Sequence, residues 1–211
     1  MGVLETLSLA MGMAWTSGLN LYATIAALGL AGRAGMIQLP ADLQILTDPI
    51  VIGVACVMYF IEFIADKVPY VDSSWDVLHT FIRVPAGAVL AAQAVGDVSP
   101  ALELAALLGG GTVSLAAHGA KATTRLAINV SPEPFSNWIA SITEDLAVLG
   151  GIWLMFHNPI LMLVLVVGFT AFAAWLIPQL YRLAKRGFQA LRTRLRGERP
   201  IENVAGTSAA Q

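Results

Sequence analysis

The residues best suited to chemistry are concentrated in one short stretch, residues 59–83. Only 12% of the chain is charged, yet this stretch is rich in ionisable side chains. They are Glu62, Asp66, Lys67, Asp72, Asp76, His79 and Arg83. Charges within or beside apolar helices are costly and are usually paired or functional. Carboxylates and imidazoles can carry protons, and cationic side chains can hold anions. The stretch therefore predicts a proton-binding or anion-binding site.

The spacing of these residues is helical on both sides of a predicted turn. Glu62 and Asp66 are four positions apart and share one helix face. A second face carries Asp76, His79, Thr80 and Arg83. Pro69 and the run 72–74 predict the turn between them, with a serine as a candidate cap of the second helix. We expect a helical hairpin with two polar faces that could meet.

Two later segments add charges of both signs. His118, Lys121 and Arg125 lie three and four positions apart, on one basic helix face, and Glu144 and Asp145 lie near the middle of the next apolar segment. The candidate substrate-binding residues are Asn20, Arg83, His118, Lys121 and Arg125. The candidates for proton coupling or ion pairing are Glu62, Asp66, Lys67, Asp72, Asp76, His79, Glu144 and Asp145. No catalytic residue and no metal ligand is assigned.

The composition indicates that these charges lie within a membrane protein. The chain has 211 residues, of which 57% are hydrophobic, and its mean hydropathy is +0.72. Soluble domains carry roughly 25% charged residues, about twice the share here. The single cysteine, Cys56, cannot form an internal disulfide. No nucleotide-binding or nucleic-acid-binding motif is present, so we expect no nucleic-acid partner.

The apolar segments predict an all-α, polytopic fold with about six transmembrane helices. Each crossing needs roughly 20 apolar residues. The expected crossings are 3–35 with a break at 16–18, 49–65, 78–95, 101–129, 138–156 and 160–176, with loops at 96–100 and 131–137. Three consecutive glycines at 109–111 indicate close helix packing more than a break.

The C-terminal part predicts a basic amphipathic helix followed by a disordered tail. The transmembrane domain is expected over 1–181, the basic helix over 182–199 and the disordered tail over 200–211. The basic residues expected on an anionic leaflet are Arg182, Lys185, Arg186, Arg192, Arg194 and Arg196. The positive-inside rule then predicts cytoplasmic N- and C-termini.

The two halves of the chain, 1–97 and 98–181, are weakly alike. Residues 18–24 can be laid on 119–125, and Glu62 can be matched with Glu144. An odd number of crossings in each half would make the repeats inverted, an arrangement typical of transporters with interrupted helices. We therefore expect two inverted three-helix repeats.

Four short motifs resemble a family of bacterial integral-membrane proteins catalogued as domain of unknown function 4126. These motifs are G-L-N-L-Y-A-T at 18–24, E-F-x-A-D-K-x-P at 62–69, D-S-x-W-D at 72–76 and H-T-x-x-R at 79–83. The resemblance covers roughly residues 10 to 180. It implies a multi-pass membrane protein but brings no activity. The positions that match are Glu62, Asp66, Lys67, Pro69, Asp72, Trp75, Asp76, His79, Thr80 and Arg83.

Three functions remain open at this point. The favoured one is a transporter or flippase for a small anionic or lipid-linked substrate, with a proton as a candidate coupling ion. The second is a membrane scaffold or accessory protein whose intramembrane charges are structural ion pairs. The third is a metal-dependent membrane enzyme, for which the residues give less support, so a non-enzyme is favoured. We expect no cofactor, membrane lipids as partners, and a homo-oligomer as an option.

Overall fold

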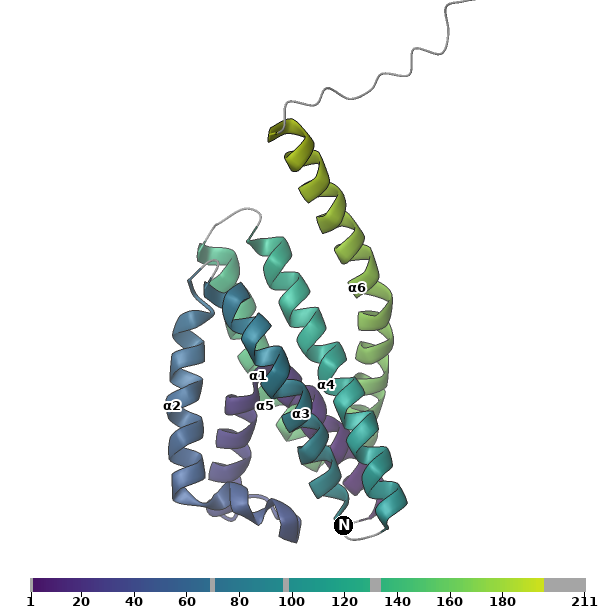
Figure 1. The fold of residues 1–211 in the computed structure, drawn as a ribbon. Coiled ribbons are helices and arrows are strands. Elements are labelled where there is room, and N and C mark those ends of the chain that lie inside the picture. Colours follow the sequence, from purple (N-terminus) through teal and green to yellow (C-terminus); the bar gives the residue numbers. More distant parts are fainter. Residues whose placement is uncertain (1, 69–70, 97–98, 130–133, 196–211) are drawn as a thin grey trace, which may run out of the picture.

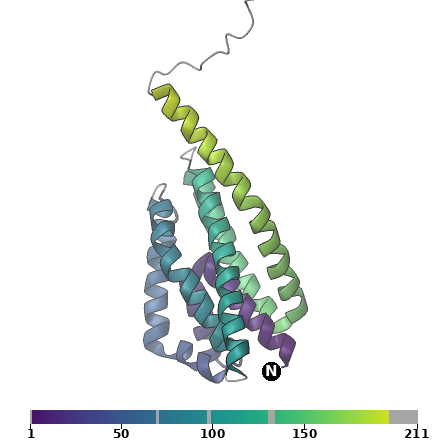
Figure 2. The same cartoon turned by 45° about the vertical axis from the view of Figure 1, so that its right-hand side comes forward.

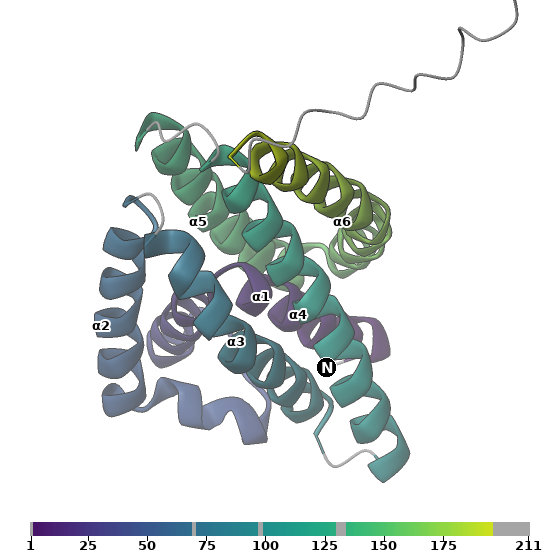
Figure 3. The same ribbon diagram turned by 45° about the horizontal axis from the view of Figure 1, so that its top comes forward.

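The computed structural model describes residues 2–68, 71–96, 99–129 and 134–195, which form helices joined by short connections and contain no strand. Side chains of the last helix are described up to Arg182. The elements are α1 (Val3–Arg33), the short 3-10 helix η1 (Ala41–Thr47), α2 (Pro49–Ala65), α3 (Val71–Val95), α4 (Pro100–Ile128), α5 (Pro134–His157) and α6 (Pro159–Leu195). They form one bundle, in which α3 and α4 lie side by side between α2 and α6 (Figures 1 and 3).

The bundle is apolar outside and charged inside, as a membrane protein must be. Val54, Val57 and Phe60 on α2 are exposed, whereas Glu62 of the same helix is fully buried. Four helices, α3 to α6, are long and apolar enough to cross a membrane. A fifth candidate span combines η1 with α2, which meet at a 64° bend. The chain is therefore a multi-pass helical protein, and the prediction of six crossings is not confirmed.

The first helix enters the bundle and turns back rather than crossing it. Its backbone leaves the helical conformation at Asn20, where φ is −149° and ψ is 100°. The side chain of Asn20 caps the second half of α1, because its Oδ1 accepts a hydrogen bond from the N–H of Ala23 at 2.9 Å. The predicted break at residues 16–18 is wrong, because these residues are helical and buried.

Contacts at its two ends confirm the bent course of α1. Near its start, Ser8 donates to the carbonyl of Met155 at 3.4 Å, close to the end of α5. Near its end, Arg33 donates to the carbonyl of Thr47, immediately before α2. These two places lie at the same end of the bundle, whereas α6 extends beyond the opposite end (Figures 1 and 2). With up to five spans, the start of α1 and the end of α6 lie at opposite ends of the bundle. The predicted placement of both termini in the cytoplasm would therefore need a sixth crossing.

The inverted repeat is not confirmed by this arrangement. Residues 18–24 lie at the break of α1, whereas their predicted counterparts, residues 119–125, lie inside an unbroken α4. The two segments therefore share sequence features without sharing a backbone course.

Three predicted helix limits are also corrected. Residues 72–74 lie in the first turns of α3 and not in the preceding turn, and residues 134–137 already belong to α5 and not to a loop. The predicted last crossing and the basic helix are one helix, α6, which passes through Pro178 without ending (Figure 2). The residues predicted to be disordered, 200–211, lie outside the described residues, as do 97–98 and 130–133 of the predicted loops.

Helix starts follow the local sequence closely. Four of the helices begin at a proline, which is favourable at the first helical position because its missing N–H has no partner to lose. Three of these starts are also capped, and at α6 the cap is Asn158, which accepts from the N–H of Leu161 at 3.1 Å. Asp48 accepts from the N–H of Ile50 at 2.7 Å, and Ser99 accepts from the N–H of Leu102 at 3.2 Å.

Small residues let α1, α3 and α4 approach one another closely. A Cβ atom on Gly110 of α4 would lie 2.3 Å from the Cβ of Ala91 on α3, and one on Gly18 of α1 would lie 2.6 Å from the carbonyl oxygen of Ser114. Gly110, the middle residue of the glycine run at 109–111, thus serves close packing, as expected, and α4 continues through the run.

Neighbouring glycines provide a test of this packing. Gly110→Ala should lower the melting temperature of the purified protein, because overpacking costs about 1–3 kcal/mol and outweighs the roughly 1 kcal/mol that alanine gains in helix propensity. Gly109→Ala is the matched control, because its Cβ would meet only Met11 at 3.8 Å. Equal melting temperatures for the two variants would contradict the close-packing interpretation.

Candidate functional site

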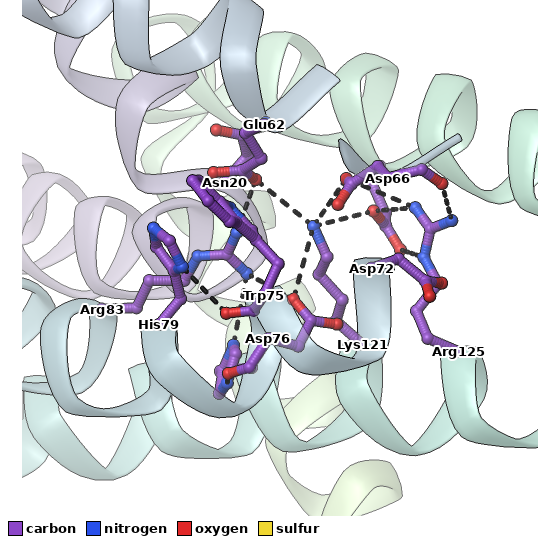
Figure 4. Close-up of polar contacts among 12 residues, drawn as sticks. Asn20, Glu62, Asp66, Asp72, Trp75, Asp76, His79, Arg83, Lys121 and Arg125 are labelled. Atoms are coloured by element: carbon purple, nitrogen blue, oxygen red, sulfur yellow. Dashed lines mark hydrogen bonds and ion pairs between the residues drawn. The ribbon is translucent and has the colours of Figure 1, made fainter. Parts of the chain in front are cut away.

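The ammonium group of Lys121 on α4 lies among four carboxylates. Its Nζ is 2.9 Å from Asp66, 3.2 Å from Glu144, 3.3 Å from Glu62 and 4.0 Å from Asp76. Two further cations, one on either side of Lys121, share these carboxylates (Figure 4). We call the seven connected residues the central ion network: Glu62, Asp66, Asp76, Arg83, Lys121, Arg125 and Glu144.

Arg83 of α3 closes one end of the network. Its guanidinium pairs with Glu62 of α2. It also pairs, at 3.3 Å, with Asp76, which lies seven positions (two helical turns) earlier on α3. The Glu62–Arg83 contact brings together the two polar faces that the spacing placed on neighbouring helices. Arg83 also donates to Nδ1 of His118 at 3.3 Å.

Arg125 of α4 closes the other end. Its Nη2 and Nε lie 2.8 and 3.3 Å from the two oxygens of Glu144 on α5, a two-pronged contact. The same guanidinium lies 3.5 Å from Asp66 and donates to the backbone carbonyls of Asp66 and Asn137. Arginine suits this position because its planar fork can hold a carboxylate with two parallel hydrogen bonds.

The network carries more acids than bases. Four carboxylates face three cations, so its formal charge is 3 − 4 = −1 when all groups are ionised. Three of the carboxylates, Glu62, Asp66 and Asp76, use only one oxygen, and the second oxygen has no hydrogen-bond partner among the described residues. The network therefore has one acid in excess and carboxylate oxygens that its three cations do not contact.

At the end of α2, neighbouring charges and burial act on two ionisable groups. Burial raises the pKa of Asp66, whereas the nearby cations Lys121 and Arg125 lower it. The effect of the cations is the larger one in sum, so this pKa lies below its ordinary value. Burial lowers the pKa of Lys67. Lys67 stands outside the network: its Nζ lies over the ring of Phe63, 2.9 Å from the centroid, and 3.4 Å from the hydroxyl of Ser141.

The two histidines have different surroundings. Nδ1 of His118 accepts from Arg83, so its proton is on Nε2, which lies 3.1 Å from the carbonyl of Asp76. Nδ1 of His79 is 2.9 Å from the carbonyl of Trp75, an acceptor, and its Nε2 is 3.1 Å from the hydroxyl of Tyr22. His118 therefore contacts the network directly, through Arg83. His79 lies beside the network (Figure 4).

Two predicted acids lie outside the network. Asp145 accepts from Asn20 at the break of α1, at 3.3 Å, and from Tyr59 at 3.0 Å. Asp72 is fully buried and accepts from Asn129 at 2.8 Å. Neither acid has an ion-pair partner within 4.0 Å among the described residues, so each is supported by amide or hydroxyl donors.

Sequence reasoning missed two of these donors, although a signal was present. Asn129 lies four positions after Arg125, on the continuation of the basic face, and Tyr59 lies three positions before Glu62, on the acidic face. Both helix faces should have been followed one turn further. The pairing of Arg125 with Glu144 could not be read in this way, because spacing within a helix does not tell which helix it faces.

The described residues give no support to a metal centre. They contain no group of three or more histidine, cysteine, aspartate or glutamate side chains arranged to hold a metal ion. The carboxylates of the network are instead directed at lysine and arginine.

An all-helical bundle with a buried charge network defines a multi-pass integral membrane protein. The chain belongs to the family described as domain of unknown function 4126, whose model matches residues 7–179. This confirms the resemblance carried by the motifs between residues 18 and 83. No curated protein and no solved structure gave a significant match.

The central position of Lys121 can be tested through stability. Lys121→Gln should lower the free energy of unfolding by roughly 3–5 kcal/mol, because it leaves buried carboxylates without their cation. Lys67→Gln is the matched control, since Lys67 contacts a ring, a carbonyl and a hydroxyl. Thermal unfolding in detergent measures both. If the Lys121→Gln and Lys67→Gln proteins melted at the same temperature, the central position assigned to Lys121 in the network would be wrong.

Proposed function

We propose that the protein is a transporter or flippase for a small anionic or lipid-linked substrate, with the central ion network as its binding site. The observation that carries this proposal is the gathering of three buried cations at one place together with one carboxylate in excess. A register device needs only matched pairs, whereas this set contains charges that can exchange partners. Arg83, Lys121 and Arg125 bind the substrate anion, and His118 supports Arg83.

The bent helix α1 supports transport in a second way. Helices interrupted inside a bundle are found where non-helical backbone lines a binding site or a water-filled path. The break at Asn20 lies next to Asp145 of α5, and Asp145 also binds Tyr59 of α2. We therefore include Asn20 in the proposed substrate-binding set, through its contact with Asp145.

Proton coupling follows from the excess of acid. When one carboxylate of the network is protonated, four acids and three bases become formally neutral, and an unpartnered carboxylate oxygen becomes a donor. Glu62, Asp66, Asp76 and Glu144 are the candidate proton carriers. Asp72, Lys67, His79 and Asp145 surround them and set the local field.

A scaffold is the second candidate, because one observation favours it. Each of the three buried cations already has carboxylate partners, so the network could serve only to hold α2, α3, α4 and α5 together.

For either function we propose that the protein lies in a bacterial inner membrane, with the end of α6 on the cytoplasmic anionic leaflet. The basic residues from Lys185 onward have side chains outside the described part of the chain.

A charge-conserving substitution tests transport without removing the network. Arg125→Lys keeps the positive charge but loses the planar fork, so we expect at least a tenfold lower rate. The rates are uptake of labelled inorganic phosphate and movement of fluorescent phosphatidylglycerol between the leaflets of proteoliposomes. Arg33→Lys, outside the network, is the control and should transport like the wild type.

Two results would contradict the proposal. One is normal transport by folded Glu62→Gln, Arg83→Gln and Lys121→Gln proteins, which would place the site elsewhere. The other is no transport of either substrate class by the wild type, together with normal folding, which would favour the scaffold.

A further inference from the structure

We infer that Glu144 occupies the position of the substrate's anionic group, and that a singly charged oxyanion with two free oxygens displaces it from Lys121 and Arg125. This inference rests on the proposed transport function and gives its site a defined chemistry. Glu144 would then be an internal competitor of the substrate, and the described arrangement would be the closed form of the site.

The geometry around Glu144 is that of a bound oxyanion. Its two oxygens face Nε and Nη2 of Arg125 at 3.3 and 2.8 Å, and one of them lies 3.2 Å from Nζ of Lys121. Carboxylates and phosphodiesters both present two oxygens that fit such a guanidinium fork. A ligand of this kind could therefore take over the same donors without a change in Arg125.

Charge balance allows Glu144 to leave, as it would any one of the four carboxylates. Without it, the network holds Glu62, Asp66 and Asp76 against Arg83, Lys121 and Arg125, and the formal charge is 3 − 3 = 0. An incoming anion with one charge restores the original −1. A doubly charged group would raise the negative charge of a buried site, so a phosphodiester or a carboxylate is favoured over a phosphomonoester.

Exposure points to the same residue. The side chain of Glu144 is 13% exposed, whereas those of Glu62, Asp66 and Asp76 are 0%, 3% and 1% exposed. Glu144 also comes from α5, which packs mainly against α1 and touches α4 at few positions. Glu144 can thus swing away from α4 without separating two tightly packed helices.

The remaining partners make this exchange tolerable. After Glu144 leaves, Lys121 keeps Glu62 and Asp66, and Arg125 keeps Asp66 together with the carbonyl of Asn137. By contrast, removal of Glu62 would leave Arg83 with Asp76 and His118 as its side-chain partners among the described residues, without backbone acceptors like the two carbonyls that Arg125 binds. The site is therefore built to lose one acid, and this acid faces the oxyanion donors.

Binding to the Glu144→Gln protein tests the inference. The full chain is placed in phosphatidylcholine nanodiscs and titrated by calorimetry with dimethyl phosphate, a soluble phosphodiester. A parallel series measures the melting temperature as phosphatidylglycerol replaces phosphatidylcholine. We expect Glu144→Gln to bind at least tenfold more tightly than the wild type to one of these probes. A gain with dimethyl phosphate assigns a soluble substrate, and a gain with phosphatidylglycerol alone assigns a lipid headgroup.

The controls separate this effect from a general change in charge. Glu103→Gln removes an exposed acid from α4 and should bind like the wild type. Adding Arg125→Gln to Glu144→Gln should abolish the gain. If Glu144→Gln does not fold, Glu144→Asp, whose shorter arm weakens the contact, should show a smaller gain of roughly threefold, about 0.65 kcal/mol.

The inference fails if neither probe binds more tightly to the Glu144 variants, or if the gain survives the loss of Arg125 or occurs in Glu103→Gln. If such a result is found while transport still depends on Arg125, only the proposed role of Glu144 is overturned and the transport function stands. A gain in binding by a protein that transports nothing would overturn the transport function and leave an anion-binding site.

Discussion

The burial of the Lys121 ammonium is the constraint on which the rest of the structure depends. An ion removed from water loses several kcal/mol of solvation, which must be repaid by close opposite charges. Four carboxylates, on α3, on α5 and at the end of α2, lie 2.9 to 4.0 Å from Nζ of Lys121. The contacts with Lys121 therefore fix where α2 ends and where α3 and α5 pass the second half of α4. They also determine which polar helix faces meet.

Close packing along the preceding turns of the same face of α4 makes this arrangement possible. Glycines at positions 18, 87 and 110 bring α1, α3 and α4 together, and the hydroxyl of Ser114 donates to the carbonyl of Arg83 at 3.0 Å. The same approach carries the break of α1 into the bundle, where Asn20 binds Asp145. Packing and charge thus act at successive levels of one face of α4: the small residues near Gly110 and Ser114 set the distance, and the ion network around Lys121 sets the register.

The sequence predicted much of this and failed for identifiable reasons. High hydropathy with few charges was sufficient for a helical membrane protein, and the three-four spacing placed Lys121 and Arg125 on one face. The break in α1 was misplaced because Thr16 and Ser17 look like helix breakers, whereas their hydroxyls bind carbonyls of their own helix. Asn20 breaks the helix because its side chain can replace the lost backbone partner. Partners across helices, such as Arg125 with Glu144, depend on tertiary packing and leave no local pattern.

The central claim is that the network contains one carboxylate more than its stability requires, and the most direct test compares the melting temperatures of Glu62→Gln and Glu144→Gln in the absence of any ligand. The account predicts that Glu62→Gln melts well below the wild type, because the fully buried Arg83 then keeps Asp76 and His118 as its side-chain partners among the described residues. Glu144→Gln should melt at or above the wild-type temperature, because Arg125 keeps Asp66 and two backbone carbonyls. An equal loss in both variants would contradict the account and would make the network a purely structural clamp.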